Sequence, residues 1–375
     1  MIELNKIYQG NCLTVLKTFP DKFFYTCITS PPYYGLRSYG SEPQIWDGKE
    51  DCKHKWDYEI IATNSGGGWF DPEKRDQYEN QRLRNPKKEK QNKVSQGKFC
   101  LKCGAWKGEL GLEPTFKLYL DHLILIFTEV KRVLRDDGTL FVNLGDSYAG
   151  SGSPGGDYKD KRGGDEYLRP YNRNELTAKT QMQIPARFSI RMTDELGFLL
   201  RNRIIWEKNV MPTSAKDRFT NNYEDIFFFS KQAKYYFEQQ LEAANYDGRK
   251  DTKFKGSSKY SSPDYTPDGN VNTFAKEGHE RWTEVNGIKM RNKRAIWKIS
   301  NEGLKEEHFA TYPQKLIEPM IRAGCPEGEV VLDPFIGSGT TGIVARKLNR
   351  NYIGIDLKYH IISDDRLTKE LGFFK

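Results

Sequence analysis

The stretch that decides the fold is Val330-Val331-Leu332-Asp333-Pro334-Phe335-Ile336-Gly337-Ser338-Gly339-Thr340-Thr341. It begins as a short apolar strand that ends in an acid, and a glycine-rich loop then opens a helix predicted to run to about Leu348. A second strand follows from Asn351 to Asp356 and again ends in an acid. Strand, glycine loop, helix and strand in this order are typical of a parallel α/β unit that binds a nucleotide-like ligand.

The details of this unit narrow the choice of ligand. The glycines let a ligand approach the backbone, and Asp356 can accept hydrogen bonds from two ribose hydroxyls. The dinucleotide pattern GxGxxG is absent, because Gly337-Ser338-Gly339 is followed by Thr340-Thr341-Gly342. No Gly-Lys-Ser/Thr follows the loop either, which argues against a phosphate-binding P-loop. A cofactor that has an adenosine but no phosphate fits better.

A second informative stretch, Thr29-Ser30-Pro31-Pro32-Tyr33, follows the apolar run from Phe23 to Ile28. Proline lacks an amide donor and fixes φ, so the predicted strand must end there. The carbonyls left unpaired, the Ser30 hydroxyl and the Tyr33 ring would form a rigid group of acceptors beside a flat apolar surface. Such a group suits an amino group on a flat heterocycle. The alternative is a strand followed by a rigid turn with no further role.

The other apolar patterns complete an α/β core. Helices are predicted at 12–19, 116–135, 184–200 and 315–323, and strands at 23–28, 139–144, 203–207 and 224–230. Residues 149–181 are expected to form a mobile loop, and the final helix after Asp356 is expected to be short.

Composition agrees with an enzyme-sized α/β protein that carries polar additions. The chain has 375 residues, enough for one large domain or two smaller ones. Its mean hydropathy of -0.76 is low for a compact protein, so polar stretches are expected outside the core. No run approaches the length of a membrane span, and the N-terminus has no signal-peptide pattern. These features predict a soluble intracellular protein.

Positive charge is concentrated in one segment. The chain has a net charge of +8, and residues 74–98 hold nine basic and three acidic side chains, a net charge of +6. Such a segment attracts phosphate backbones and predicts nucleic-acid binding, with Lys87, Lys88 and Lys90 as candidate contacts. The alternative is a solvated loop, and both descriptions can hold because such arms often order only when bound.

Four metal-ligand side chains stand in the polar insertion at 41–112, which shows no sustained hydrophobic period. Cys52-Lys53-His54 supplies one pair, and Cys100-Leu101-Lys102-Cys103 followed by Gly104 resembles the turn of a zinc ribbon. Four such ligands satisfy tetrahedral Zn²⁺ and would hold the ends of the basic segment together. The zinc would be structural, because four protein ligands leave no open position. The alternative is unconnected reduced thiols.

Together the two informative stretches resemble the β-type amino-group DNA methyltransferases, which use S-adenosylmethionine. The catalytic tetrapeptide precedes the cofactor loop in sequence, as in that type, and the resemblance covers residues 5–37, 116–148, 184–237 and 305–356. It implies an α/β fold with a Rossmann-like S-adenosylmethionine-dependent methyltransferase sheet, circularly permuted motif order and polar insertions. It also implies double-stranded DNA as substrate, a cognate restriction endonuclease as possible partner, and a prokaryotic or phage-encoded protein of the cytoplasm.

The resemblance implies a role for each matching residue. The catalytic residues would be Ser30, Pro31, Pro32 and Tyr33. The cofactor-binding residues would be Asn11, Thr311, Tyr312, Asp333, Pro334, Phe335, Gly337, Ser338, Gly339, Thr340, Thr341 and Asp356. Two positions depart from the family pattern, because Asn11 stands where Asp is common and Leu357-Lys358-Tyr359-His360 replaces Asn-Pro-Glu-Tyr.

The expected domain organisation follows from these assignments. Residues 1–40 and 113–237 would form the catalytic part of the core, and 301–375 the cofactor-binding part. Residues 41–112 would be a basic insertion with the zinc knuckle, and 238–300 a target-recognition region.

The chemistry favours methylation of an exocyclic amine on a base that has been flipped out of the duplex. Serine at the first motif position resembles the cytosine-N4 enzymes, whereas Asp or Asn there more often marks adenine-N6, which is the alternative. Carbon-5 methylation would need a cysteine preceded by proline, and Cys325-Pro326 has the reverse order. That reaction is therefore discounted.

Two further classes of function are weighed. A methyltransferase acting on RNA or on protein glutamine is one, although Asn-Pro-Pro-Tyr is the usual protein-modifying form and this chain has Ser30. An inactive DNA-binding protein is the other. The intact Ser30, Asp333 and Asp356 argue against lost activity.

Overall fold

The computed structural model describes residues 2–36, 38–61, 93–149, 176–177, 179–209, 215–244, 283–300 and 312–372. The strands of its central sheet are β1 (Lys6–Gln9), β2 (Phe24–Thr29), β7 (Leu134–Leu144), β8 (Leu199–Glu207), β9 (Tyr223–Ser230), β13 (Ile296–Lys298), β14 (Val330–Asp333) and β15 (Asn351–Asp356). The helices around it are α1 (Cys12–Leu16), α3 (Phe116–Val133), α4 (Ile184–Asp194), α5 (Gln314–Gly324), α6 (Thr340–Lys347) and α7 (His360–Leu371).

Within the described residues the central sheet has the strand order β1-β15-β14-β2-β7-β9-β8-β13. Neighbouring strands are parallel, except that β9 runs antiparallel to both β7 and β8. The order interleaves the two ends of the chain, since β14 and β15 come from the C-terminal part and lie between β1 and β2. The predicted fold class, a Rossmann-like sheet with permuted motif order, is confirmed.

Helices cover both faces of this sheet, and the strands are apolar on both sides as a consequence. Along β9, Phe227 and Phe229 belong to one core, and Ile226 and Phe228 belong to the other. The first core includes buried side chains of α1, α3 and α4, and the second includes those of α5, α6 and α7. This alternation explains why the apolar strand runs in the sequence are nearly continuous.

Two predicted boundaries differ from the structure. The helix predicted to end at residue 135 ends at Val133, and β7 begins at once because Leu134 pairs with Phe24. The helix predicted to reach residue 200 ends at Asp194, because Gly197 adopts a φ of +63° and turns the chain into β8. In both cases pairing within the sheet outweighs the local helical pattern.

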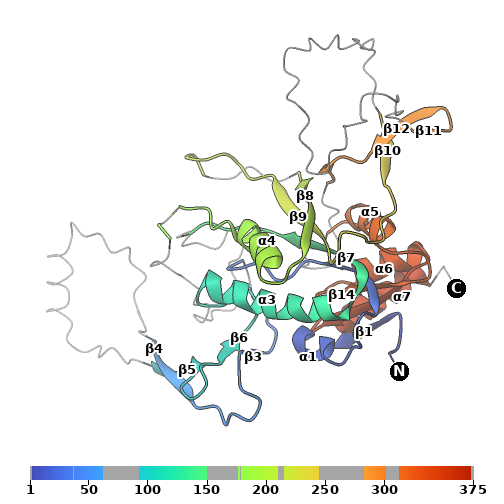
Figure 1. The fold of residues 1–375 in the computed structure, drawn as a ribbon. Coiled ribbons are helices and arrows are strands. Elements are labelled where there is room, and N and C mark those ends of the chain that lie inside the picture. The colour runs from blue at the N-terminus through green and yellow to red at the C-terminus, as the bar shows by residue number, and fades with distance from the viewer. Residues whose placement is uncertain are drawn as a thin grey trace, which may run out of the picture.

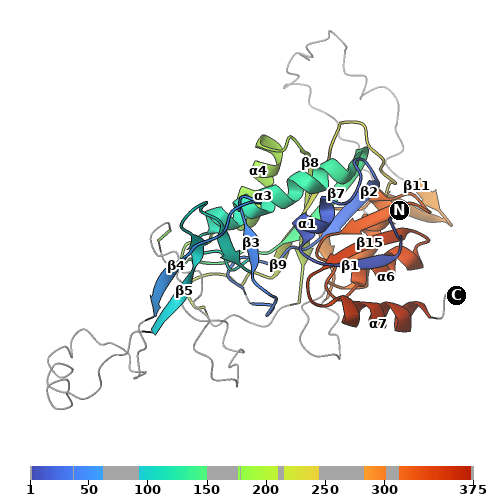
Figure 2. The same ribbon diagram turned by 90° about the horizontal axis from the view of Figure 1, so that it is seen from below.

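The polar insertion contains a second sheet, which the sequence pattern did not predict. Its strands are β3 (Gln44–Trp46), β4 (Trp56–Ile61), β5 (Lys93–Cys100) and β6 (Trp106–Gly108). They lie in the order β3-β6-β5-β4, and Figures 1 and 2 show β4 and β5 projecting from the end of the molecule away from the C-terminus. The strands are short and their partners are distant in sequence, so no single window shows a period. Lys87, Lys88 and Lys90 lie outside the described residues.

A third, antiparallel sheet contains β10 (Leu241–Ala243), β12 (Ile288–Asn292) and β11 (Thr283–Val285) in that order. Asn286 and Gly287 form the tight turn between β11 and β12, with φ values of +50° and +76°. The range 238–300, predicted as a recognition region, holds this sheet as well as β13 of the central sheet. Its residues 245–282, and residues 150–175 and 178 of the predicted loop, lie outside the described part. None of the described helices has both the length and the apolar character that a membrane span requires.

Candidate active site

The two motifs singled out in the sequence meet at one edge of the central sheet. Strands β2 and β14 are parallel neighbours, with Leu332 opposite Cys27. Parallel strands place their carboxyl ends at the same edge, where open α/β sheets bind ligands. The hydroxyl of Thr29 donates a hydrogen bond to the carboxylate of Asp333, with 2.7 Å between Oγ1 and Oδ1. The predicted catalytic tetrapeptide therefore begins directly beside the glycine-rich loop.

Asp333 is fully buried and organises this loop from within. Its Oδ1 accepts from Thr29 and from the amide of Phe335 at 3.0 Å. Its Oδ2 accepts from the hydroxyls of Thr341 at 2.6 Å and Tyr312 at 2.8 Å. Burial raises the pKa of Asp333 to about 6, although these hydrogen bonds favour the ionised form. A carboxylate has about four lone-pair positions, so these four donors saturate it.

The glycine-rich loop from Pro334 to Gly339 depends on backbone shapes that glycine provides. Gly337 and Gly339 have φ values of +49° and +84°, in the left-handed region. The side chains of Ser338 and Thr340 are buried and turn toward Arg366 of α7, not outward. The loop therefore presents its backbone and the partly exposed Phe335 to a ligand.

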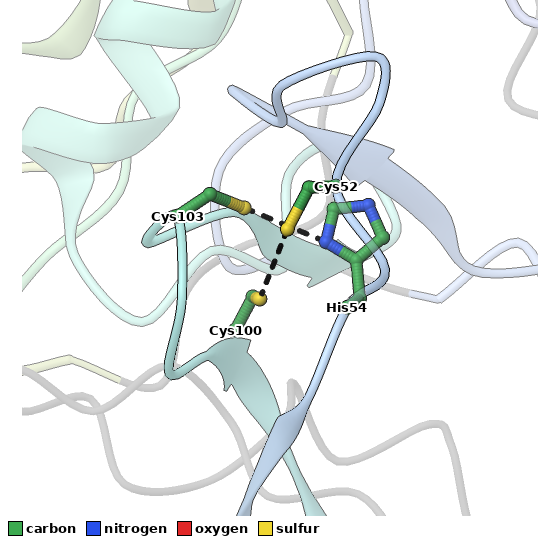
Figure 3. A group of neighbouring side chains, drawn as sticks. All are labelled: Cys52, His54, Cys100 and Cys103. Carbon is green, nitrogen blue, oxygen red and sulfur yellow. Dashed lines mark hydrogen bonds between the residues drawn. The ribbon is translucent and has the colours of Figure 1, made fainter.

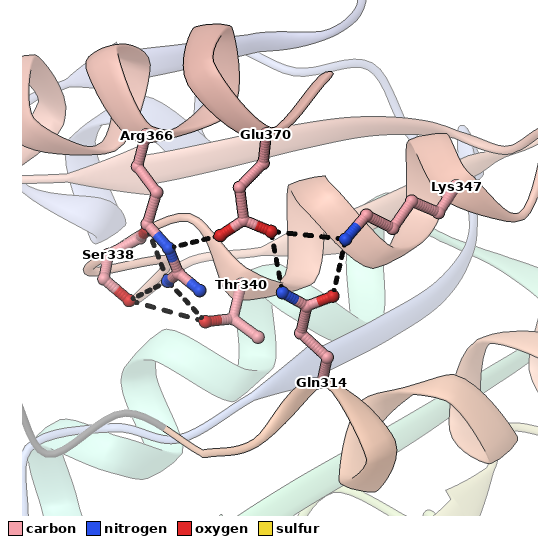
Figure 4. Close-up of polar contacts among 6 residues, drawn as sticks. All are labelled: Gln314, Ser338, Thr340, Lys347, Arg366 and Glu370. Carbon is pink, nitrogen blue, oxygen red and sulfur yellow. Dashed lines mark hydrogen bonds and ion pairs between the residues drawn. The ribbon is translucent and has the colours of Figure 1, made fainter. Parts of the chain in front are cut away.

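Helix α7 forms hydrogen bonds with the glycine-rich loop. The sequence did not predict this contact. Arg366 donates to the carbonyl oxygen of Ser338 at 3.2 Å, to its hydroxyl at 2.9 Å and to the hydroxyl of Thr340 at 3.0 Å (Figure 4). Glu370 accepts from Arg366 at 2.9 Å, and also from Gln314 of α5 and Lys347 of α6. The helix predicted to be short has 12 residues, and its polar face is what joins it to the loop.

Asp356 lies at the same edge, at the end of β15. It is partly exposed, and its Oδ1 accepts from the amides of Lys358, at 2.7 Å, and Tyr359. Partial burial raises its pKa. The amine of Lys358 and the hydroxyl of Tyr359 each reach the carbonyl oxygen of Tyr39 at 3.0 Å. The segment that departs from the family pattern thus ties the cofactor side to the chain that follows Tyr33.

Asn11 and Thr311 are two further residues that were predicted to bind the cofactor. Asn11 is the N-cap of α1, and its Oδ1 accepts from the amides of Leu13 at 2.9 Å and Thr14 at 3.4 Å. Its Nδ2 donates to Gln44 at 3.4 Å. Asn11 is near Asp356, because the neighbouring Gly10 donates its amide to the Asp356 carbonyl at 3.1 Å. Thr311 lies outside the described residues.

Ser30 and Tyr33 begin a polar network that crosses to β7 and β9. The Ser30 hydroxyl lies 3.3 Å from the Tyr33 hydroxyl, which contacts Glu224 Oε2 at 2.8 Å and Asn143 Oδ1 at 3.0 Å. Glu224 also forms an ion pair with Lys208, and both side chains are largely shielded. Burial, and next the charge of Glu224, raise the pKa of Tyr33 well above its ordinary value, so it stays a donor. Sequence patterns alone did not identify Asn143, Glu224 or Lys208.

The Tyr33 loop, predicted to be rigid from its prolines, is closely packed. A Cβ atom at Gly145 would lie 2.5 Å from the Tyr33 ring, so only glycine allows the ring to sit there. A Cβ at Gly111, whose φ is +91°, would lie 2.9 Å from the Tyr33 carbonyl oxygen. The hydroxyl of Tyr119 donates to the carbonyl of Pro32 at 2.7 Å, and Pro31 is buried.

The cysteines near the core are unsuited to nucleophilic catalysis. Cys325 is fully buried, and burial raises its pKa to about 12. Burial also raises the pKa of Cys27, in β2, well above its ordinary value. A nucleophilic cysteine must reach its thiolate form. Neither Cys27 nor Cys325 therefore suits carbon-5 methylation.

The four predicted metal ligands come together beside the second sheet. The ligand atoms of Cys52, His54, Cys100 and Cys103 all lie within 4.8 Å of one another (Figure 3). Cys52 Sγ is 4.0 Å from Cys100 Sγ, and Cys103 Sγ is 3.5 Å from His54 Nδ1. The cluster lies at the base of the β4–β5 pair, where Trp56 pairs with Cys100.

Comparison with known proteins identifies the family. A family model for N6 and N4 methyltransferases, described as DNA methylase, matches residues 24–365. The type II methyltransferase M.XycI of Xanthomonas campestris pv. cyanopsidis is 31% identical over 366 residues, which cover 96% of this chain and 87% of that protein. M.SmaI of Serratia marcescens is 32% identical over 369 residues, which cover 97% and 91%.

Among solved structures, the PvuII DNA methyltransferase (cytosine-N4-specific) has a TM-score of 0.51 and 18% identity, and the match covers 98% of this chain and 90% of that one. At this identity the likeness concerns the fold. The family match extends across both motifs, from β2 to α7. The chain therefore belongs to the N6/N4 DNA methylase family and is an S-adenosylmethionine-dependent DNA methyltransferase.

Proposed function

We propose that this chain transfers a methyl group from S-adenosylmethionine to the exocyclic N4 amine of a flipped-out cytosine in duplex DNA. The serine that begins Ser30-Pro31-Pro32-Tyr33 supports cytosine over adenine. Family membership favours DNA over RNA or protein glutamine as the substrate. The names of its relatives, type II methyltransferases, support a place in a restriction–modification system.

The observation that carries this proposal is the contact between Ser30 and Tyr33 at the end of β2. An exocyclic amine is a weak nucleophile because its lone pair is delocalised into the ring. Ser30 donates its proton to the Tyr33 oxygen, so the lone pairs of Ser30 are free to accept one amine N–H. The carbonyl of Pro31 accepts the other. Two such acceptors draw the nitrogen toward tetrahedral geometry and aim its lone pair at the methyl donor.

Tyr33 and Glu224 support Ser30 in its role as acceptor for the amine. The phenol proton goes to Glu224 or Asn143, which leaves the Tyr33 oxygen to accept from Ser30. As the new N–C bond forms and the S–C bond breaks, the amine must lose one proton. Ser30 takes that proton as its own moves to Tyr33, and the proton of Tyr33 moves to Glu224. Catalysis then combines positioning, electrostatics and this proton transfer, without a covalent enzyme intermediate.

S-Adenosylmethionine supplies an electrophilic methyl group on a sulfonium. The chain would bind it at the edge formed by β14 and β15. Asp356 would accept hydrogen bonds from the ribose hydroxyls, and Gly337 and Gly339 would let the cofactor approach the loop backbone. The side chains of Asp333 and Thr341 bond to each other within the protein, so they would shape the pocket instead of touching the cofactor.

Expression in a bacterial host that lacks DNA methylases tests the proposal. Digested host DNA should contain N4-methylcytosine when resolved by nucleoside mass spectrometry, and no N6-methyladenine. Appearance of N6-methyladenine alone would replace cytosine by adenine as the target. Unmodified DNA from a host that makes soluble protein would refute the proposal.

A further inference from the structure

We propose that Cys52, His54, Cys100 and Cys103 form a structural zinc site that braces the catalytic loop. The zinc site stands on its own geometry. The bracing role rests on the proposed function of Ser30 and Tyr33, because it concerns the loop that carries them. Two sets of observations support the proposal. One is the spacing of the ligand atoms, and the other is the set of contacts that connects the ligands to the Tyr33 loop.

Two separations among the four ligand atoms are close to those of a zinc tetrahedron, and all four atoms lie within 4.8 Å of one another. With Zn–S bonds of about 2.3 Å and Zn–N bonds of about 2.05 Å, tetrahedral ligands lie about 3.8 Å apart for two sulfurs and about 3.6 Å apart for sulfur and nitrogen. The corresponding separations are 4.0 Å between Cys52 and Cys100, and 3.5 Å between Cys103 and His54. A disulfide would need sulfurs about 2.05 Å apart, so these cysteines are not paired.

The backbone around the cluster has the features of a metal-binding turn. Gly104 adopts a φ of +75° and returns its amide to the Cys100 carbonyl at 2.9 Å. The amide of Lys102 points at Cys100 Sγ at 3.4 Å, which stabilises a thiolate there. The amide of Leu101 donates to the Lys55 carbonyl at 2.7 Å. The backbone hydrogen bonds of this turn therefore bring the two ligand pairs together without a bound metal ion.

The ligand set selects the metal. Three thiolates and one imidazole in a tetrahedral arrangement suit Zn²⁺, whereas Mg²⁺ and Ca²⁺ prefer oxygen ligands. All four positions are filled by protein, so the ion would have no open site for substrate. A structural site of this kind contributes directly to the stability of the segment that carries it.

A buried histidine fixes the second sheet to α3. His122 lies within α3 and is fully buried, with Nδ1 2.9 Å from Glu113 and Nε2 2.9 Å from Asp47. Its ring is stacked against Trp46 of β3, at 4.8 Å between centroids, and Trp106 of β6, at 5.6 Å. The sheet beside the four proposed ligands is thereby anchored to the catalytic core.

The chain that leaves β6 then holds the catalytic loop. Glu109 accepts from the Ser38 hydroxyl at 2.8 Å, the Tyr39 amide at 3.1 Å and the Ser41 hydroxyl at 3.2 Å. Gly111 accepts the Gly35 amide at 2.8 Å through its carbonyl. Cys100 and Cys103 define the turn between β5 and β6, so a metal there fixes the start of the segment that supports residues 33–36 and 38–41.

Metal analysis of the full-length chain tests the zinc site. Protein from zinc-supplemented cells should contain one zinc per chain by mass spectrometry of the metal. The zinc content of Cys103→Ala and of His54→Ala should be at least fivefold lower than that. Cys12 is a buried cysteine outside the cluster, so Cys12→Ala should keep the full zinc content. Wild-type protein with less than one tenth of an equivalent would overturn the site.

Cobalt gives a readout that does not need a ligand variant to fold. After the wild-type chain is stripped with a chelator, Co²⁺ alone should produce the intense visible bands of a tetrahedral site and thiolate charge transfer. An equimolar addition of Zn²⁺ should abolish both. A spectrum typical of octahedral cobalt would overturn the assignment, whatever the enzyme methylates.

Methyl transfer from labelled cofactor to DNA tests the bracing role. The stripped chain should lose at least tenfold in turnover, regain it with Zn²⁺ alone, and bind S-adenosylmethionine with less than a twofold change in Kd. Full turnover without metal would overturn the bracing role. The metal content is measured separately, so failure of this test is distinguishable from failure of the catalytic proposal.

Discussion

The hydroxyl of Thr29 donates to the carboxylate of Asp333 across 2.7 Å, and this one hydrogen bond joins residues 304 positions apart. Thr29 is the residue before Ser30, and Asp333 is the residue before the glycine-rich loop. Both side chains are buried, so the bond is shielded from water. The proposed acceptor for the amine and the proposed loop for the methyl donor are thus held in one fixed relation.

Thr29→Val should test this relation, because valine keeps the shape of threonine and removes the donor. A hydrogen bond to a charged group contributes about 1.5–3 kcal/mol, so the free energy of unfolding should fall by about that amount in urea titrations. Thr29→Ser is the matched control and should lose much less, since it keeps the hydroxyl. An unfolding midpoint for Thr29→Val equal to that of the wild type would contradict the account.

Asp333 should also make stability depend on pH. Its pKa is raised to about 6 by burial, against about 3.9 in an unfolded chain. Between these values the folded state keeps a proton that the unfolded state has released. The free energy of unfolding should therefore fall, by up to about 3 kcal/mol, as the pH rises from about 4 to about 6, and then level off.

Asp333→Asn isolates this contribution, because asparagine has the same shape and does not titrate. Urea unfolding should be measured between pH 4 and pH 7. The free energy of unfolding of the wild type should fall with rising pH relative to that of the variant. Two parallel curves would show that the Asp333 pKa is not raised.

Tyr33→Phe should lower turnover with little change in cofactor affinity. The variant removes the oxygen that accepts from Ser30 and the donor to Glu224. Loss of one positioned group of this kind costs about 10²-fold in rate. Tyr223→Phe, on the same strand as Glu224, is the control. Stopped-flow measurement at saturating cofactor gives the rate of methyl transfer. A wild-type rate for Tyr33→Phe would show that the Tyr33 hydroxyl has no role in that step.

Arg366→Gln should weaken cofactor binding without unfolding the sheet. The guanidinium supports Ser338 and Thr340 through three hydrogen bonds. Loss of about 1.5–3 kcal/mol of charged hydrogen bonding corresponds to about a 10- to 100-fold higher Kd. Arg322→Gln breaks an exposed ion pair with Glu318 on α5 and serves as control. Calorimetry that finds equal affinities for all three proteins would exclude a role for α7.

Much of the site is predictable because its chemistry is local in sequence. Ser30 to Tyr33 and Asp333 to Thr341 are continuous stretches whose prolines and glycines have specific backbone consequences. The parallel-sheet rule is enough to bring their ends to one edge. The turn of the proposed metal site was also predictable, because Cys100-Leu101-Lys102-Cys103 followed by Gly104 is a local pattern.

The remaining site residues depend on contacts that no local pattern records. Glu224 lies on β9 and Lys208 directly follows β8, and their link to Tyr33 exists only once β9 lies beside β7. Arg366 looks like an ordinary surface charge on a helix until α7 packs over the loop. The second sheet was missed for the same reason, since its strands gain stability from distant partners and from His122.

The most direct test of the central claim uses S-adenosylmethionine with a trideuterated methyl group. Purified protein, unmethylated bacterial DNA and this cofactor are incubated, and the nucleosides are resolved by mass spectrometry. The account predicts trideuteromethyl label on the N4 amine of cytosine, and at least a 10²-fold slower appearance with Ser30→Ala, which removes one positioned acceptor. Label on adenine N6 or no label on DNA, or equal rates for both proteins, would contradict it.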